Sequence, residues 1–156
     1  MSDSESNVAT YLTLDGKVFI APQFAIAYDE KLQDGGTCPD FVALDLPKKE
    51  VIIVEVSEAA NISGLIDRIK DRQNRWYNPA RRVLTQNHVI DESWHEPRFL
   101  GVVRKDVLDR ARQIFSDHPD VAFISVEQVA FPWEYWNQRM ERGLANNSNQ
   151  ATVFNQ

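Results

Sequence analysis

The sequence predicts an α/β fold in which a central mixed β-sheet is flanked by helices. Two observations predict it. Short apolar runs of strand length alternate with longer segments in which apolar residues recur at helical spacing. In addition, the run 51–54 is apolar at every position, as expected for a central strand covered on both faces. A sheet with helices packed on both faces accommodates this order of elements.

Length and composition are those of one globular domain. The chain has 156 residues, of which 43% are hydrophobic and 26% charged, enough to bury a core. We expect residues 10–145 to form this domain. A flexible segment at 1–9 precedes it, and a disordered tail at 146–156, rich in Asn and Gln, follows it.

Charge and cysteine content narrow the class of protein. The net charge of -6 argues against a generally basic surface, but it leaves room for one local basic patch. Cys38 is the only cysteine, so no intramolecular disulfide can form. The acidic N-terminus does not resemble a signal peptide, and no apolar run is long enough to span a bilayer. We expect a cytoplasmic protein without membrane association.

The N-terminal half is expected to consist mostly of hairpins. Asp15-Gly16 is a hairpin signal, and a short helix is expected after it, at 22–32. A second hairpin follows, in which both strands are strongly apolar. The expected strands are 11–14, 17–20, 41–46 and 51–56.

Helices and strands alternate in the C-terminal half. Asn61 and Ser63 can cap a helix. This helix is expected to end at Tyr77, because the residue before Pro79 avoids helical backbone. The remaining expected elements are a strand at 99–103, a helix at 106–115, a strand at 121–126 and a final helix from Phe131 to about Leu144.

Two carboxylates mark one end of the second hairpin. Asp40 directly precedes its first strand, and Glu55 lies near the end of its second. Because a hairpin brings the outer ends of its strands together, we expect the two side chains to lie side by side. Adjacent carboxylates repel unless a cation lies between them, which predicts a Mg²⁺ or Mn²⁺ site with the Val56 carbonyl as a further ligand. The alternative is two separate, solvated acids.

Pro39-Asp40, the hairpin and Glu55 resemble the PD-(D/E)XK nuclease superfamily, whose signature is Pro-Asp, a hairpin and then acid-x-Lys. The resemblance spans about residues 22–126 and implies a restriction-endonuclease-like core with the order αβββαβ, in which 22–32 is the first helix. It also implies hydrolysis of DNA phosphodiesters by a metal-activated water. Glu30 is then a further acid of the site, and Asp29 is an equal candidate.

Ser57 stands where the superfamily has its lysine. That lysine neutralises charge on the phosphate, which a serine hydroxyl cannot do. Lys70, on the next helix, is the candidate replacement. The alternatives are that Lys70 is a solvated surface charge, or that catalysis is lost. In the second case the protein is an inactive module that binds nucleic acid or a protein partner and could form a homodimer.

Gln73 and Tyr77 match Gln-x-x-x-Tyr, a motif that lines the active site in the RecB-like branch of the superfamily. On a regular helix they lie one turn apart and share a face with Lys70. The resemblance therefore implies catalytic roles for all three. The alternative is a polar residue at the edge of the apolar stripe and an aromatic residue that closes the helix.

The same region concentrates arginines in an otherwise acidic chain. Arginine is well suited to phosphate, so we expect a nucleic-acid-binding patch, with DNA favoured over RNA. Trp76 and Tyr77 could stack on bases. The alternative is an ordinary exposed helix with internal ion pairs. The expected patch comprises Arg68, Arg72, Arg75, Arg81 and Arg82.

Overall fold

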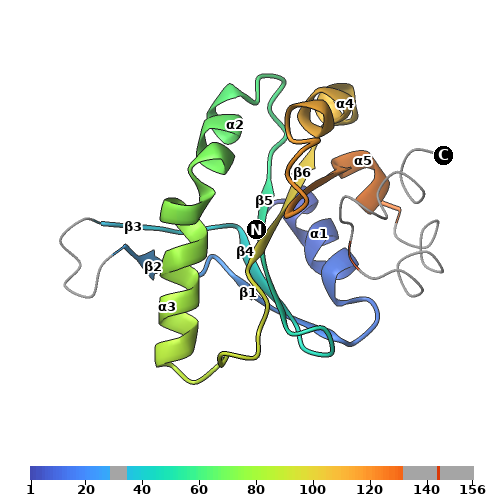
Figure 1. The fold of residues 1–156 in the computed structure, drawn as a ribbon. Helices are drawn as coiled ribbons and strands as arrows, with labels where there is room; N and C mark the ends of the chain where they lie inside the picture. The colour runs from blue at the N-terminus through green and yellow to red at the C-terminus, as the bar shows by residue number, and fades with distance from the viewer. Residues whose placement is uncertain (29–34, 132–143, 145–156) are drawn as a thin grey trace.

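A five-stranded mixed sheet lies between two layers of helices (Figure 1). The computed structural model describes residues 1–28, 35–131 and 144. In spatial order, the strands are β1 (Val18–Pro22), β4 (Phe41–Asp45), β5 (Glu50–Val56), β6 (Arg98–Val103) and β7 (Val121–Ser125). A separate two-stranded sheet pairs β2 (Ile26–Ala27) with β3 (Gly36–Thr37). The helical segments are α1 (Asp3–Thr13), α2 (Ser63–Lys70), the π-helical turn η1 (Gln73–Tyr77), α3 (Asn78–Gln86), α4 (Lys105–Ile114) and α5 (Val126–Val129).

The topology of the large sheet confirms the expected α/β class. β1, β4 and β5 pair antiparallel in succession, whereas β5, β6 and β7 run parallel. β5 is the central strand, and residues 51–54 are fully buried, as their continuous apolar character predicted. The core under α2, α3 and α4 fills one face of the sheet, and the core under α1 and α5 fills the other.

The second hairpin and the C-terminal strands lie where the sequence predicted them. β4 and β5 are joined by a tight turn and pair in a register that sets Phe41 opposite Val54. β6, α4 and β7 begin and end within one or two residues of the expected bounds. Each of these elements has strong apolar patterning and flanking turn residues.

The N-terminus is helical, so the flexible segment expected at 1–9 and the strand expected at 11–14 are both wrong. Ser2 and Glu5 form a capping box: the Ser2 hydroxyl accepts from the Glu5 N–H at 3.2 Å, and the Glu5 carboxylate accepts from the Ser2 N–H at 3.0 Å. The helix then buries Val8, Tyr11 and Leu12 against the sheet. The turn at 15–16 therefore joins a helix to β1 and does not close a hairpin.

The helix expected at 22–32 is absent from the described part of that segment. β1 extends to Pro22, and Gln23 adopts a left-handed backbone with φ of 52°. This conformation cannot continue a right-handed helix. β2 follows, and residues 29–34 lie outside the described part of the chain. The first helix of the fold is α1.

The helix that begins after Asn61 does not end before Pro79. α2 passes through the turn η1 into α3, and Pro79 lies in the first turn of α3. Proline is tolerated at this position, directly after the point where the π-helical turn interrupts the regular α-helical hydrogen bonding. The apolar residues of this segment form a buried stripe that faces the sheet: Ile62, Leu65, Ile66, Ile69 and Trp76.

The final helix expected from Phe131 to Leu144 falls almost entirely on residues 132–143, outside the described part, as does the expected tail at 146–156. Leu144 is described, and it is buried against the α1 side of the sheet. Among the described residues, no helix combines the length and the apolar character that crossing a bilayer requires.

Gly101→Ala is expected to lower the free energy of unfolding by about 1–3 kcal/mol, the usual cost of overpacking. A Cβ on Gly101 would stand 2.6 Å from the ring of Phe123 and 3.2 Å from that of Phe99, both fully buried. Urea denaturation measures the change. Gly64→Ala is the matched control, because the nearest atom to its Cβ is the flexible end of Arg68 at 3.6 Å. If Gly101→Ala were as stable as the wild type, Phe123 would have room to move away from the added methyl group.

Candidate active site

The β4–β5 hairpin brings Asp40 and Glu55 together. Phe41 pairs with Val54, so the next position outward sets Asp40 opposite Glu55. Side chains on one face of a strand recur every second residue. Glu55 therefore shares the face of Val51 and Ile53, which is the face covered by α2. The sequence-based expectation that these two carboxyl groups lie side by side is confirmed.

The two carboxyl groups interact directly. Asp40 Oδ2 accepts a hydrogen bond from the Val56 N–H at 2.7 Å, which orients its carboxylate. Burial, a hydrogen bond with Asp40 and the negative charge of Asp40 raise the pKa of Glu55 to about 8, against a smaller lowering effect of Arg68. Glu55 therefore keeps its proton at neutral pH, as expected for two carboxyl groups held close without a cation between them.

Arg68 is the cation of α2 that acts on this pair. It is half-buried, and its positive charge lowers the pKa of Glu55. Its Nη1 lies 3.6 Å from the point where a Cβ on Gly64 would stand, so the guanidinium folds back over the first turn of α2. Lys70, by contrast, is exposed at the last residue of α2. The sequence predicted that Arg68 contacts phosphate and that Lys70 takes the role of the missing lysine.

Ser57 follows Glu55 by two residues, where β5 has just ended. Its N–H donates to the carbonyl of Val102 at 2.9 Å, which continues the pairing with β6. Its hydroxyl accepts from the N–H of Ala59 at 3.3 Å. The hydroxyl thus orders the loop that leads to α2.

The donor set fits a hard divalent cation. Carboxylate and carbonyl oxygens are the ligands that Mg²⁺ and Mn²⁺ prefer. A cation bound between Asp40 and Glu55 would relieve the repulsion between their carboxylates. Within the described ranges, no group of three or more His, Cys, Asp or Glu side chains is placed to hold a metal ion. The two carboxyl groups of Asp40 and Glu55 are the donors that the structure brings together here.

Gln73 and Tyr77 both lie in η1, a π-helical turn and not the regular helix that the sequence predicted. The two side chains differ in burial. Gln73 is exposed, whereas Tyr77 is fully buried. The Tyr77 hydroxyl donates to Asp120 Oδ2 at 2.8 Å. Asp120 precedes β7, at the end of the parallel strands opposite to Glu55.

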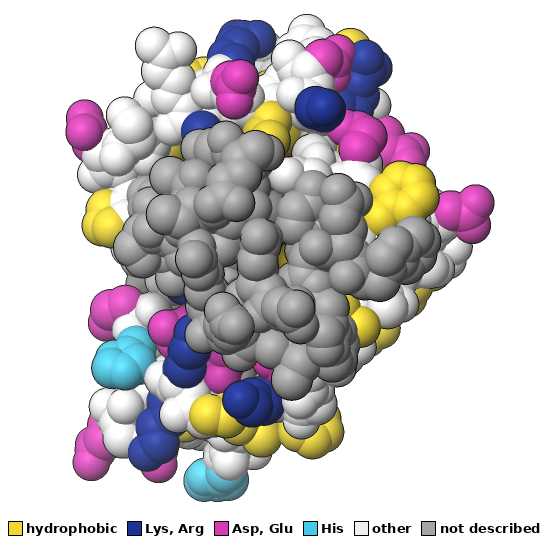
Figure 2. All heavy atoms as spheres, turned by 90° about the vertical axis from the view of Figure 1, so that its right-hand side faces the viewer, with side chains coloured by type: hydrophobic (Ala, Val, Ile, Leu, Met, Phe, Trp, Pro, Cys, Tyr) yellow, Lys and Arg dark blue, Asp and Glu magenta, His cyan; other side chains and the backbone are white. Residues whose placement is uncertain are grey.

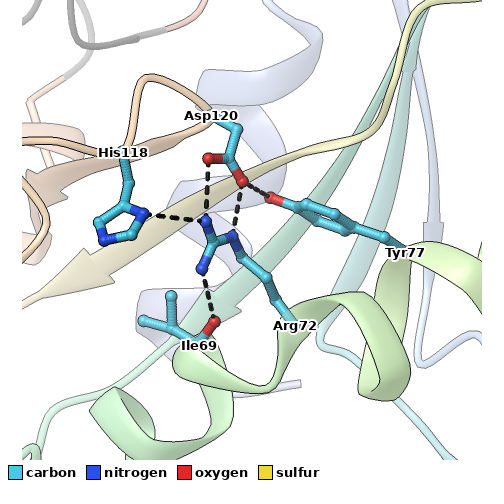
Figure 3. Close-up of polar contacts among 5 residues, drawn as sticks. All are labelled: Ile69, Arg72, Tyr77, His118 and Asp120. Carbon is cyan, nitrogen blue, oxygen red and sulfur yellow. Dashed lines mark hydrogen bonds and ion pairs between the residues drawn. The ribbon is translucent and has the colours of Figure 1, made fainter.

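Tyr77, Arg72 and Asp120 form a polar cluster between η1 and the start of β7 (Figure 3). Arg72 donates to both oxygens of Asp120, at 2.6 and 3.0 Å, and to the Ile69 carbonyl at 3.0 Å. Burial alone would raise the pKa of Asp120, but hydrogen bonds from Arg72 and Tyr77 outweigh it and hold the pKa below its usual value. Burial raises the pKa of Tyr77, and the charge of Asp120 adds to this. The cluster fastens the helical layer to the sheet.

Asp120→Ala is expected to lower the free energy of unfolding by about 2–4 kcal/mol, because it leaves the guanidinium of Arg72 unpaired with its side chain only 13% exposed. Since the pKa of Asp120 is lowered in the folded state, its contribution is present above its ordinary pKa and is lost as pH falls through the folded value. The gap between wild type and variant should therefore close in strong acid. Tyr77→Phe, which keeps the ion pair, should cost only about 1 kcal/mol. Denaturant titrations at several pH values check all three expectations, and equal stabilities at pH 7 would contradict them.

Two further arginines of the expected patch hold other parts of the chain. Arg81 forms an ion pair with Glu96. Arg82 donates to the backbone carbonyls of Tyr28, at 2.9 Å, and of Ala27. Together with Arg72, three of the five arginines are thus bound within the protein.

Trp76 belongs to the core. It is fully buried, stacks on Phe99 with ring centroids 5.2 Å apart, and donates to the Thr37 hydroxyl at 3.1 Å. It is therefore not available to stack on bases. Arg75 lies with its guanidinium 5.7 Å from the centroid of the Trp76 ring. On the face seen in Figure 2, basic and acidic side chains are interspersed over the described surface.

Sequence reasoning missed Asp120, although a signal for it was present. Pro119-Asp120 precedes β7 just as Pro39-Asp40 precedes β4. It also missed Glu5, which lines a hollow of ≈ 250 Å³ with Asp40. The expected additional acid, Glu30, lies outside the described residues.

Comparisons with family models, with curated proteins and with solved structures found no match to this chain.

Proposed function

We propose that this chain is a Mg²⁺- or Mn²⁺-dependent nuclease that acts on DNA and is built on the PD-(D/E)XK plan. The observation that carries the proposal is the juxtaposition of Asp40 and Glu55 at the end of a hairpin, where the positive charge of Arg68 acts on Glu55. The order α1, β1, β4, β5, α2, β6 also supports it, because it repeats αβββαβ with α1 in the place of the first helix.

Each residue of the site has a distinct role in this proposal. Asp40, oriented by the Val56 N–H, and Glu55 would hold the cation together with the Val56 carbonyl. Glu55 would give up its proton as the cation binds. The cation would supply Lewis acidity toward a phosphate oxygen and acidify a water molecule. Arg68 would place positive charge beside the negative charge that develops on the phosphate, which is the task of the lysine in the superfamily signature.

Ser57 favours a second candidate function. Its hydroxyl is engaged in the loop after β5, and it provides no charge at the position of the superfamily lysine. If Arg68 does not replace that charge, the chain is an inactive module that binds nucleic acid or a protein partner, and it could act as a homodimer.

Incubation of the purified protein with supercoiled plasmid, single-stranded DNA and matched RNA, with Mg²⁺, Mn²⁺ or a chelator, tests the proposal. We expect metal-dependent cleavage of DNA. Absence of cleavage in every arm would overturn the nuclease assignment. DNA binding without cleavage would then support the second candidate, provided that log affinity falls with log salt by about 0.9 per contacted phosphate. Ser57→Lys would identify an otherwise intact scaffold if it alone created a metal-dependent nuclease.

A further inference from the structure

A second hollow lies at the other end of β5 from the candidate active site. Its volume is ≈ 660 Å³, and it is bounded by Val51 at the start of β5, by α3 and by the segment 88–97. Val51 is four residues from Glu55, or about 13 Å along a strand. The volume falls in the range of small-molecule sites, which is roughly 300–1,000 Å³. It is far larger than a single ion needs.

One wall of this hollow is apolar and aromatic. Val51, Ile90 and Pro97 are buried, and Trp94 is half-buried and packs on the core below. An indole in this position offers both apolar area and the negative face of its ring, which attracts cations. We call this site the Trp94 hollow.

The segment that forms the hollow is held in shape by hydrogen bonds. The His95 N–H donates to the Lys49 carbonyl at 3.0 Å, and Lys49 Nζ donates to the Ser93 hydroxyl at 2.8 Å. These bonds tie the segment to the β4–β5 turn. A site with a fixed shape loses less entropy when a ligand binds.

His88 adds an imidazole to the lining at a position that favours glycine. It has a left-handed backbone with φ of 59°, directly after α3, where the Val89 N–H closes the helix on the Leu84 carbonyl at 2.9 Å. Glycine is preferred at such positions because it has no Cβ. The imidazole is therefore present in the hollow despite a local cost that glycine would avoid.

Charges in the Trp94 hollow favour a cation. Three carboxylates line it, against the guanidinium of Arg81 in the lining and the ammonium of Lys49, which lies beside it at Ser93. Glu96 pairs with Arg81, and Asp91 accepts from Ser93. Glu92 is exposed and has no hydrogen bond or ion pair within the part of the chain that the structure describes. It is thus the carboxylate available to a ligand.

We propose that the Trp94 hollow binds a small organic cation, an amine or amidine carried on a flat or apolar body. The cationic group lies at Glu92, and the apolar body lies against Trp94 and Ile90. This site is independent of the Asp40–Glu55 pair and does not rest on the nuclease assignment.

Benzamidine is a suitable probe, because it joins an amidinium to a flat ring. Benzamide is its neutral analogue of the same shape, and benzoate is the anionic one. We expect calorimetry to show saturable binding of benzamidine, weaker binding of benzamide and none of benzoate. In amide and indole NMR spectra, the shifts caused by benzamidine should map to Trp94, His88 and Thr85, which line the hollow.

Three variants decide whether the site is the Trp94 hollow. Glu92→Gln should weaken benzamidine about fivefold, the scale of one exposed ion pair, with little change for benzamide. Thr85→Trp, which fills the hollow from an exposed position on α3, should abolish binding of both. Asp67→Asn removes an exposed carboxylate of α2 outside the hollow and should change nothing. Equal affinity for benzamide and benzamidine, unchanged affinity in Glu92→Gln or Thr85→Trp, or no binding at millimolar benzamidine would each overturn the proposal.

Discussion

Asp40→Asn and Glu55→Gln are each expected to abolish metal-dependent cleavage of DNA, with a loss of about 10³-fold or more in kcat. Each change removes one of the two anionic donors that face each other at the end of the β4–β5 hairpin. Calorimetric titration with Mg²⁺ and Mn²⁺ should show the same loss in metal affinity. Asp45→Asn, at the far end of β4, is the matched control and should keep both DNA cleavage and metal binding.

Metal binding should also release protons in a predictable way. Because the pKa of Glu55 is about 8 in the metal-free protein, Glu55 is mostly protonated at pH 7 and must ionise to bind a cation. Mg²⁺ uptake at pH 7 should therefore release nearly one proton, and apparent affinity should rise with pH up to about 8. Potentiometric or two-buffer calorimetric measurements detect this, and Glu55→Gln should eliminate it.

The same pKa predicts how stability depends on pH without metal. A folded-state pKa above the ordinary value of 4.5 means that the folded protein binds more protons than the unfolded chain between these values. Stability should fall as pH rises through this window, and Glu55→Gln should flatten the curve. If instead Asp40→Asn or Glu55→Gln strongly destabilised the metal-free protein, or if metal affinity were unchanged, the two carboxyl groups would be structural.

Arg68→Ala is expected to lower kcat about 10²–10³-fold with little change in KM, because the charge of Arg68 would act mainly on the transition state. The pKa of Glu55 should rise further in this variant, since Arg68 now lowers it. Metal and DNA binding should persist. Lys70→Ala, at the exposed end of α2, is the matched comparison and should retain most activity.

Two outcomes would distinguish Arg68 from Lys70 as the source of the positive charge. Loss of cleavage in Lys70→Ala with full activity in Arg68→Ala would show that Lys70, and not Arg68, takes the role of the missing lysine. Full activity in both would show that neither supplies it. Rescue of Arg68→Ala by Ser57→Lys would show that the charge matters, and not the particular side chain. Arg68→Lys should rescue only in part, because a lysine lacks the planar fork of the guanidinium.

The pairing of Asp40 with Glu55 could be predicted because it depends on short-range information. A tight turn between two strongly apolar strands sets the register, and the register alone places the two residues opposite each other. The partner of Arg72 could not be predicted in this way, since Asp120 lies 48 residues further along the chain. Only the packing of η1 against the start of β7 brings them together.

The N-terminal helix was missed for a different reason. The capping box of Ser2 and Glu5 was visible in the sequence, but a run of polar residues around it indicated a flexible segment. The helix is stabilised by burial of Val8 and Leu12 on the sheet, a tertiary contact that outweighs weak local propensity.

The π-helical turn between α2 and α3 puts the two ends of this helical segment out of phase by one residue. A π-helical turn spans one residue more than an α-helical turn, and each residue corresponds to about 100° of rotation. Ile69 before it and Ala80 after it are both buried on the same face of the sheet. If all residues of the segment formed a regular α-helix instead, one of the two apolar faces would rotate by about 100°, away from the sheet. Deleting one residue of η1 would restore regular hydrogen bonding and leave both faces on the sheet. Evolutionary relatives of this chain should therefore either keep the π-helical turn or lack one residue between Ile69 and Ala80.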